Sequence, residues 1–179
     1  MNKRLFYALD IHLNDKKKID KARQPFLKNM RPVAVDNLHI TLCFMGNIST
    51  DCTKALIAEA DHLSHIVPKL KIAQSKITTN AIGLFKKPQV LFLDFKQFPE
   101  EFRNIANALS LAASNLGIHQ EKRPYHPHLT IARKAKKVPK YNDFLLTIPI
   151  HSFSLYESIS TNRGVKYTPL KTWNILSND

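Results

Sequence analysis

Two stretches of this sequence repeat one pattern, a His-x-Thr triplet inside an apolar run. The first places His39 and Thr41 among aliphatic residues, and the second does the same with His128 and Thr130. Successive side chains of a β-strand point to opposite faces, so each histidine shares a face with its threonine while the aliphatic neighbours face the other way. The pattern predicts two strands, each with a buried face and a face that carries an imidazole and a hydroxyl.

The residues before the two motifs are organised alike. An apolar strand is expected over residues 5–11 and again over 89–95. An amphipathic helix follows each strand, after the expected N-cap Asn14 in the first half and between Pro99 and Gly117 in the second. Two strand–helix–strand halves of similar spacing indicate an α+β chain of two related lobes. Chance resemblance between two common units is the alternative.

The rest of the chain predicts one more helix and three more strands. The helix is expected to begin near Ser49, Thr50 and Asp51, each of which could cap it. The strands are expected over residues 69–79, with Leu70 and Ile72 on the buried side, and over 148–159 and 166–176.

The charge of the chain is the feature of its composition that points to a partner. Lys and Arg number 27 against 14 Asp and Glu, which gives a formal net charge of +13 at pH 7. Such a positive field attracts polyanions through counterion release, so nucleic acid is the expected partner. Lysines that only solvate the surface are the alternative.

The cysteines and the N-terminus indicate a compartment. Cys43 and Cys52 are too few for a disulfide framework and lack the paired spacing of a zinc site, which favours a reducing cytoplasm. The first apolar run meets Asp10 too early for a signal peptide, and no stretch is long enough to span a membrane. We expect a cytoplasmic protein with no membrane partner, no metal and no cofactor.

Two imidazoles and two hydroxyls suit acid–base chemistry on a phosphodiester. One imidazole can take a proton from the attacking oxygen while the other gives a proton to the leaving oxygen. The hydroxyls can donate to the non-bridging oxygens, where charge collects in the transition state. The chain lacks a G-x-x-x-x-G-K-[ST] loop, so any ligation would proceed without ATP. A lone histidine in a strand is more often structural, and the pairing of the two motifs is what predicts catalysis.

Over nearly the whole chain the sequence resembles the two-histidine phosphoesterases, and within them the bacterial RNA 2',3'-cyclic phosphodiesterases, also called LigT-like 2'-5' RNA ligases. Besides the two motifs, the resemblance rests on residues 4–9, 31–34, 123–126 and 167–173. It implies a bilobal α+β fold in which residues 1–179 form one domain. Two antiparallel sheets would face each other across a central cleft, with helices outside and one His-x-Thr strand in each pseudo-two-fold-related lobe.

The resemblance also implies a reaction. His39 would donate a proton to the leaving 3'-oxygen, His128 would accept a proton from water, and Thr41 and Thr130 would hold the phosphate. The expected substrate is RNA with a 2',3'-cyclic phosphate end, tRNA-like fragments among them, which a monomer would hydrolyse to a 2'-phosphate. Run backwards, the same centre would join such an end to a 5'-hydroxyl as a 2'-5' linkage.

Three further residues are candidates for the site. Arg133 and Phe44 match positions that the family uses near the phosphate and near the base. By strict alternation, however, Arg133 lies on the face of Leu129, and Phe44 has the same parity problem with core burial as the alternative. His126 shares the alternation of His128 and is positioned to approach the substrate.

Two other readings of the sequence stay open. The chain could be a basic RNA-binding module without catalysis, in which strands present aromatic and Lys side chains. It could also apply the same chemistry to a small cyclic nucleotide or to another 2'-5'-linked molecule.

Overall fold

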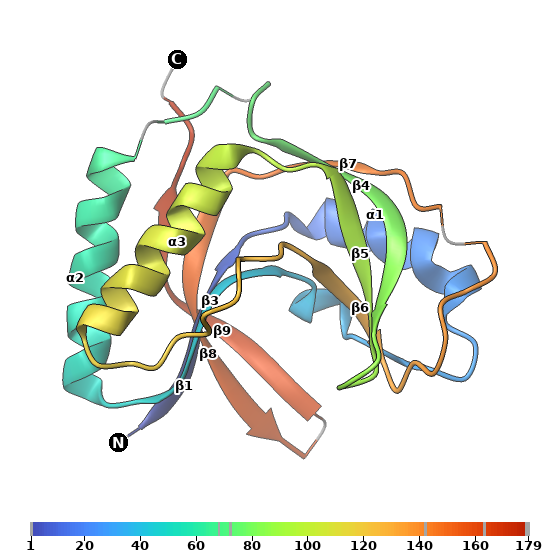
Figure 1. The fold of residues 1–179 in the computed structure, drawn as a ribbon, viewed down its shortest axis with the longest axis horizontal. Coiled ribbons are helices and arrows are strands. Elements are labelled where there is room, and N and C mark those ends of the chain that lie inside the picture. Colours follow the sequence, from blue (N-terminus) through green and yellow to red (C-terminus); the bar gives the residue numbers. More distant parts are fainter. Residues whose placement is uncertain (1, 68, 72, 142, 163, 178–179) are drawn as a thin grey trace.

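The expected α+β fold is confirmed by the computed structural model, which describes residues 2–67, 69–71, 73–141, 143–162 and 164–177 (Figure 1). The helices are α1 (Leu13–Arg23), α2 (Thr50–Ile66) and α3 (Glu100–Asn115), with short 3₁₀ turns η1 (Gln24–Phe26) and η2 (Val35–Asn37). The strands are β1 (Lys3–Leu9), β2 (Arg31–Pro32), β3 (Ile40–Ile48), β4 (Lys76–Phe85), β5 (Val90–Gln97), β6 (Leu129–Arg133), β7 (Thr147–Pro149), β8 (Ser152–Thr161) and β9 (Gly164–Asn174).

The strands of the described chain form one continuous, curved antiparallel sheet (Figure 1). Their order is β7-β4-β5-β6-β3-β1-β8-β9, and β2 pairs with the last two residues of β6, Ala132 and Arg133. The two halves expected as facing sheets are therefore joined where β3 meets β6, through the antiparallel pair Ile40 and Leu129. The order β1, α1, β3 in one half matches β5, α3, β6 in the other.

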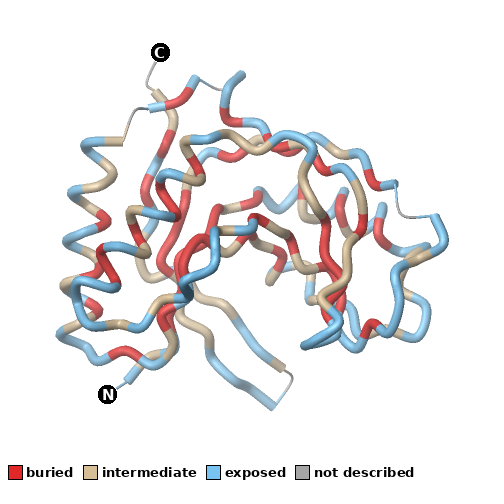
Figure 2. Tube along the Cα trace, viewed as in Figure 1, coloured by how far each residue is buried: buried red, intermediate tan, exposed pale blue. Residues whose placement is uncertain are grey.

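The helices bury apolar stripes, as their sequence periodicity predicts. Helices α2 and α3 lie side by side at one end of the molecule, while α1 lies at the other (Figure 1). Helix α3 buries Phe102, Ile105 and Leu109. Figure 2 shows the buried residues following the central strands and the inward sides of α2 and α3. Among the described residues, no helix is long and apolar enough to cross a bilayer.

Two of the expected helix caps are confirmed and one is wrong. The Ser49 hydroxyl accepts a hydrogen bond from the Cys52 N–H at 3.3 Å and caps α2. Gly117 follows α3 with a φ of +77°, a left-handed conformation that glycine adopts without strain. Helix α1, however, begins one residue before Asn14, and the cap is His12, whose Nδ1 accepts from the Asn14 N–H.

Two of the expected strands differ from the prediction. Residues 73–75 form a turn, and the Lys71 carbonyl accepts from the Gln74 N–H at 2.8 Å, so the strand expected over 69–79 begins only at Lys76. Ile72 lies outside the described residues. The strand expected over 148–159 is divided at residues 150–151 into β7 and β8, because β7 pairs with β4 while β8 pairs with β1.

Candidate active site

The pair Ile40 and Leu129 brings the two His-x-Thr motifs together. Residues directly opposite each other in an antiparallel pair point to the same face, and both of these side chains are fully buried at 0% exposure. The histidine and threonine on either side of each buried residue therefore lie on the other face, around one point. All four are half-buried. As predicted, the two motifs form one constellation, although each histidine lies just before the first residue of its strand.

The His39 ring is held at both nitrogens. Its Nδ1–H donates to the Asn37 carbonyl at 2.7 Å, which fixes the tautomer because a carbonyl oxygen can only accept. Nε2 of the neutral ring is then free to accept, and the Thr41 hydroxyl lies 3.1 Å from it. His39 thus presents Nε2 to the same face as the hydroxyl of its own motif.

The His39 imidazole is neutral at neutral pH in this environment. Burial lowers its pKa from 6.5 to about 4, and the hydrogen bond to Asn37 opposes this shift. The positive charges of Lys16, His128 and Arg133 lower the pKa of His39 further.

His128 repeats this arrangement in the second half. Its Nδ1–H donates to the His126 carbonyl at 2.8 Å, which leaves Nε2 available. Burial lowers the pKa of His128; the hydrogen bond to His126 opposes the shift, and the charge on the His126 ring adds to it. His126 itself is exposed, and its Nε2 lies 4.0 Å from the Asp94 carboxylate. Its backbone thus positions His128, while direct contact with substrate stays a prediction.

Each histidine packs against aromatic rings that the sequence analysis missed. The rings of Phe6 and Tyr167 both lie 5.0 Å from the His39 ring. Phe85 and Phe92 stack on each other at 4.2 Å and meet His128 at 5.0 and 5.7 Å. Alternation along β5 could have placed Phe92 on the face of the two histidines, because it lies one residue before the buried Leu93. The positions of the other three rings, Phe6, Phe85 and Tyr167, depend on contacts between distant strands.

A β-bulge places Phe44 on the same face of the sheet as His39 and Thr41. Relative to β1, strand β3 contains two extra residues, Leu42 and Met45, and the first of them lies between Thr41 and Phe44. Thr41 pairs with Ala8 and Phe44 pairs with Phe6, and these partners lie two residues apart on one face of β1. Phe44 therefore shares the face of Thr41 and is 49% exposed. The parity expected from strict alternation is wrong, and the side chain is not buried in the core.

A second bulge, at the equivalent place, does the same for Arg133. Strand β6 contains one extra residue, Ile131, relative to β5. Thr130 pairs with Phe92 and Arg133 pairs with Val90, again two residues apart on one face. Arg133 is exposed and lies on the same face as His128 and Thr130, so the expected parity with Leu129 is wrong here as well.

Hydrogen bonds from distant elements stabilise both irregular segments. The Arg23 guanidinium, which is buried, donates to the carbonyls of Ile131 and Val33, each at 2.7 Å. The Tyr125 hydroxyl donates to the Thr41 carbonyl at 2.9 Å, next to the first bulge. These donors compensate for the regular ladder pairing that a bulge interrupts.

Lys16 is a further cation near the site that the sequence did not reveal. Its Nζ donates to the Asp36 carbonyl at 2.6 Å, which ties α1 to the turn before β3. Burial lowers the pKa of Lys16, and the charges of Asp36 and Asp10 oppose this shift. No pattern within α1 separates Lys16 from Lys17 and Lys18.

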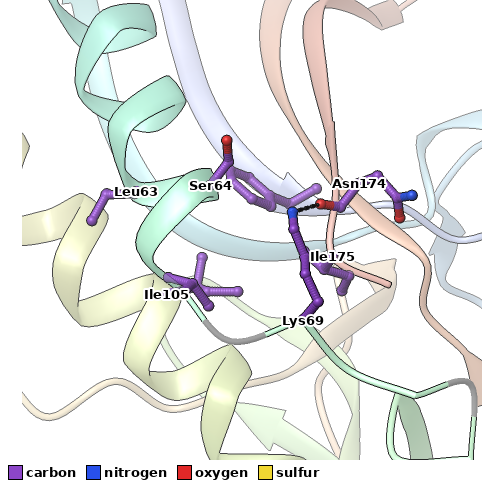
Figure 3. Close-up of a pocket in the computed structure, with 8 residues that line it drawn as sticks. Leu63, Ser64, Lys69, Ile105, Asn174 and Ile175 are labelled. Atoms are coloured by element: carbon purple, nitrogen blue, oxygen red, sulfur yellow. Dashed lines mark hydrogen bonds between the residues drawn. The ribbon is translucent and has the colours of Figure 1, made fainter. Parts of the chain in front are cut away.

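An apolar hollow elsewhere in the molecule is separate from this constellation. It lies where the end of α2 faces α3 and β9, and it is lined by Leu63, Lys69, Ile105 and Ile175 among others (Figure 3). The Lys69 ammonium donates to the Asn174 carbonyl beside it. None of the expected site residues lines this hollow. The described residues contain no group of three or more His, Cys, Asp or Glu placed to hold a metal ion.

Sequence comparison identifies relatives that span most of the chain. The model of the 2'-5' RNA ligase superfamily matches residues 12–148. The RNA 2',3'-cyclic phosphodiesterase of Escherichia coli is 32% identical over 177 residues, which cover 95% of each chain. The Bacillus subtilis protein of the same name is 32% identical over 151 residues and 80% of each chain.

Structural comparison agrees. The crystal structure of E. coli LigT complexed with 3'-AMP superposes with a TM-score of 0.86 at 31% identity, over 99% of this chain and all of that chain. The structure of the same protein complexed with phosphate has a TM-score of 0.79 at 28% identity, covering 98% of this chain and 99% of that chain. The family match, the full-length relatives and the shared fold together show that this chain belongs to the 2'-5' RNA ligase superfamily.

Proposed function

We propose that this protein hydrolyses the 2',3'-cyclic phosphate at RNA ends to a 2'-phosphate, with His39 and His128 as acid and base. The observation that carries the proposal is the Ile40–Leu129 pair, which gathers both motifs on one face of one sheet. The relatives named RNA 2',3'-cyclic phosphodiesterase supply the substrate class. The net charge of +13 suits an RNA ligand. We also infer that residues 1–179 act as one two-lobed domain.

In the proposed step, water attacks the cyclic phosphorus while the bond from phosphorus to the 3'-oxygen breaks. Nε2 of His128 accepts the proton of the attacking water, and Nε2 of His39 donates a proton to the leaving 3'-oxygen. Thr41 and Thr130 donate hydrogen bonds to the non-bridging oxygens, where charge develops. The two imidazoles supply both proton transfers, so the scheme calls for no metal ion.

The proton on Nε2 of His39 has to be acquired before the step. In this structure burial holds the pKa of His39 at about 4, and the charges of Lys16 and Arg133 add to the effect. A bound phosphate diester carries a negative charge that favours the imidazolium and offsets those cations. Substrate binding therefore raises the pKa of His39 and favours protonation of its Nε2. The acid is thus in its active form when the phosphate is bound.

Hydrolysis of adenosine 2',3'-cyclic phosphate in EDTA tests the proposal. We expect adenosine 2'-phosphate as the product, and a loss of kcat of about 10²- to 10⁴-fold in each of His39→Ala and His128→Ala. His62→Ala, which removes an exposed histidine of α2, is the matched control and keeps the wild-type rate. RNA binding without turnover would instead support a non-catalytic module. Turnover of the mononucleotide but not of a cyclic-phosphate oligonucleotide would support a small-molecule substrate.

A substrate with sulfur in place of the bridging 3'-oxygen assigns the two roles. A thiolate leaves without needing a proton, so the acid becomes dispensable while the base does not. We expect His39→Ala to recover activity on this substrate and His128→Ala to remain inactive. The opposite pattern would exchange the two roles.

We further propose that the protein works as a monomer in the cytoplasm. Both cysteines are free thiols, as a reducing compartment requires, and burial raises the pKa of Cys43 to about 12. Light scattering after gel filtration should give the mass of one chain, 20.5 kDa. The activity should be the same with and without a reductant.

A further inference from the structure

Two segments far apart in the sequence bring five lysines together on the side of the molecule away from α2 (Figure 1). One segment is the turn between β4 and β5, and the other is the loop that follows β6. The Ala135 N–H donates to the Gln89 carbonyl at 3.1 Å, and Val90 pairs with Arg133, so the turn and the start of the loop lie side by side. We call the exposed lysines of these two segments the lysine surface: Lys86, Lys87, Lys134, Lys136 and Lys137.

The backbone of both segments directs these side chains to solvent. Ala135 is fully buried at 0% exposure, whereas Lys134 and Lys136 on either side of it are exposed, as are Lys86 and Lys87 in the turn. Lys134 has a φ of +58°, a left-handed conformation that glycine adopts without strain and lysine adopts at a cost. Glycine would be the better residue if this position only turned the chain, so the lysine there indicates a role for its side chain.

The positive charge of the lysine surface is not compensated within the described chain. Residues 86–93 and 133–141 contain no Asp or Glu. None of the five lysines forms an ion pair with a described carboxylate, whereas Lys3, Lys18 and Lys171 elsewhere each do. Gathering like charges costs free energy through their mutual repulsion, and a bound polyanion relieves that repulsion.

The lysine surface is continuous with the face of the two histidines. Phe85 is the last residue of β4, and its ring lies 5.0 Å from the ring of His128. Lys86 and Lys87 are the next two residues of the chain. When the end of an RNA chain lies at His128, the nucleotides before that end are therefore within reach of the lysines.

We propose that the lysine surface binds the sugar–phosphate backbone of the RNA that precedes the cyclic phosphate end. The contact is made through charge, over several nucleotides, and without regard to base sequence. This inference rests on the proposed function, and it adds a docking surface outside the group of residues that performs the reaction. It predicts that the protein binds long RNA ends more tightly than short ones.

Binding of two reaction products of different length tests the surface without any turnover. The probes are fluorescein-labelled oligoadenylates of two and of twelve nucleotides, each with a 2'-phosphate end, and fluorescence anisotropy measures their affinity. We expect wild type to bind the longer probe about tenfold more tightly or more. The triple variant Lys86→Gln, Lys87→Gln, Lys136→Gln should lose most of this preference. Its plot of log K against log salt for the longer probe should be shallower by about 0.7 for each phosphate contact removed.

A matched triple variant separates the lysine surface from net charge. Lys54→Gln, Lys71→Gln and Lys76→Gln together remove the same charge from exposed positions elsewhere, and this variant should keep the length preference and the salt dependence of wild type. Lys134→Gly is a second check, because the backbone conformation at this position suits glycine. It should weaken binding of the longer probe and unfold at the same denaturant concentration as wild type or a higher one.

Three results would overturn the inference. The first is equal affinity and equal salt dependence in wild type and in the variant of the lysine surface. The second is an equal loss in the matched variant, since net charge would then be the cause. The third is binding to phosphatidylserine vesicles through the same lysines without preference for the longer RNA, which would assign the surface to a membrane. Failure of wild type to hydrolyse adenosine 2',3'-cyclic phosphate would instead overturn the proposed function, on which the binding measurements do not depend.

Discussion

Ile40 and Leu129 form the pair that joins the two halves of the sheet, and both are fully buried. The imidazoles and hydroxyls on either side of this pair owe their proximity to it. Both imidazoles also share an environment that disfavours their charged forms, because burial lowers the pKa of each. The pH dependence of the protein should reflect this shared property.

The rate should decline toward neutral pH when substrate is scarce. The step needs one charged and one neutral imidazole, and kcat/KM reports the pKa values of the free enzyme. Both values lie below 6.5, so kcat/KM should fall as the pH rises above about 6.5. The profile of kcat should lie at higher pH, since bound phosphate raises these pKa values. Initial rates from pH 4 to 9 check this, and coincident profiles would contradict it.

The stability of the fold should depend on pH through His39. Between pH 6.5 and about 4 the unfolded chain binds a proton on this residue that the folded chain does not, so the free energy of unfolding falls as the pH is lowered through this window. The loss should be roughly 2–3 kcal/mol. Urea denaturation at several pH values measures it. His39→Asn should lose this part of the dependence, whereas His62→Asn should keep it.

Removing the charge of Lys16 should raise the pKa of His39. The ammonium is among the charges that lower this pKa. In Lys16→Gln, the His39 resonances in a histidine-detected NMR titration should therefore move at higher pH than in wild type. Lys17→Gln, on the exposed side of the same helix, is the matched control. Equal titration of His39 in wild type and Lys16→Gln would show that the charge of Lys16 has no effect there.

A methyl group at Gly83 should disturb the rings beside His128. A Cβ at this position would clash with the tip of the Phe92 ring, which packs against both Phe85 and His128. Gly83→Ala should cost about 1–3 kcal/mol of unfolding free energy and lower activity, because the ring must move. Adding Phe92→Leu should recover part of the stability. If the single variant is as stable as wild type, the close contact is not maintained in solution.

Loss of the Arg23 guanidinium should destabilise the segment that contains the second bulge. Arg23→Met removes the donor to the Ile131 and Val33 carbonyls and leaves Asp20 without its ion-pair partner. We expect a loss of about 2–4 kcal/mol. Arg103→Met, at a half-exposed arginine of α3, should change stability by less than about 1 kcal/mol. Denaturant unfolding of the two variants compares them directly.

Alternation and helical periodicity were sufficient to predict what lies within single elements. The shared face of His39 and Thr41, the apolar stripe of α3 and the glycine after it all depend on neighbours in sequence. The cap of α1 was predicted at Asn14 because that residue type commonly caps helices, whereas the structure uses the His12 ring. The turn at residues 73–75 could not be predicted, because the apolar residues around it alternate as they would in a strand.

Features that depend on pairing between distant strands could not be predicted. The extra residues Leu42 and Ile131 are defined only relative to β1 and β5, so neither β3 nor β6 reveals them by itself. The faces of Phe44 and Arg133 were therefore predicted wrongly. Lys16 was not singled out for the same reason, since its significance comes from residues far along the chain.

The two bulges at Leu42 and Ile131 change which face of the sheet the following side chains occupy. After the extra residue, each strand presents one long side chain on the face of its histidine, Phe44 in one half and Arg133 in the other. Deleting Leu42 or Ile131 would restore regular alternation at that point and turn Phe44 or Arg133 to the opposite face of the sheet. Phe44 and Arg133 therefore lie on the face of the two histidines only because an extra residue separates each of them from the threonine of its motif.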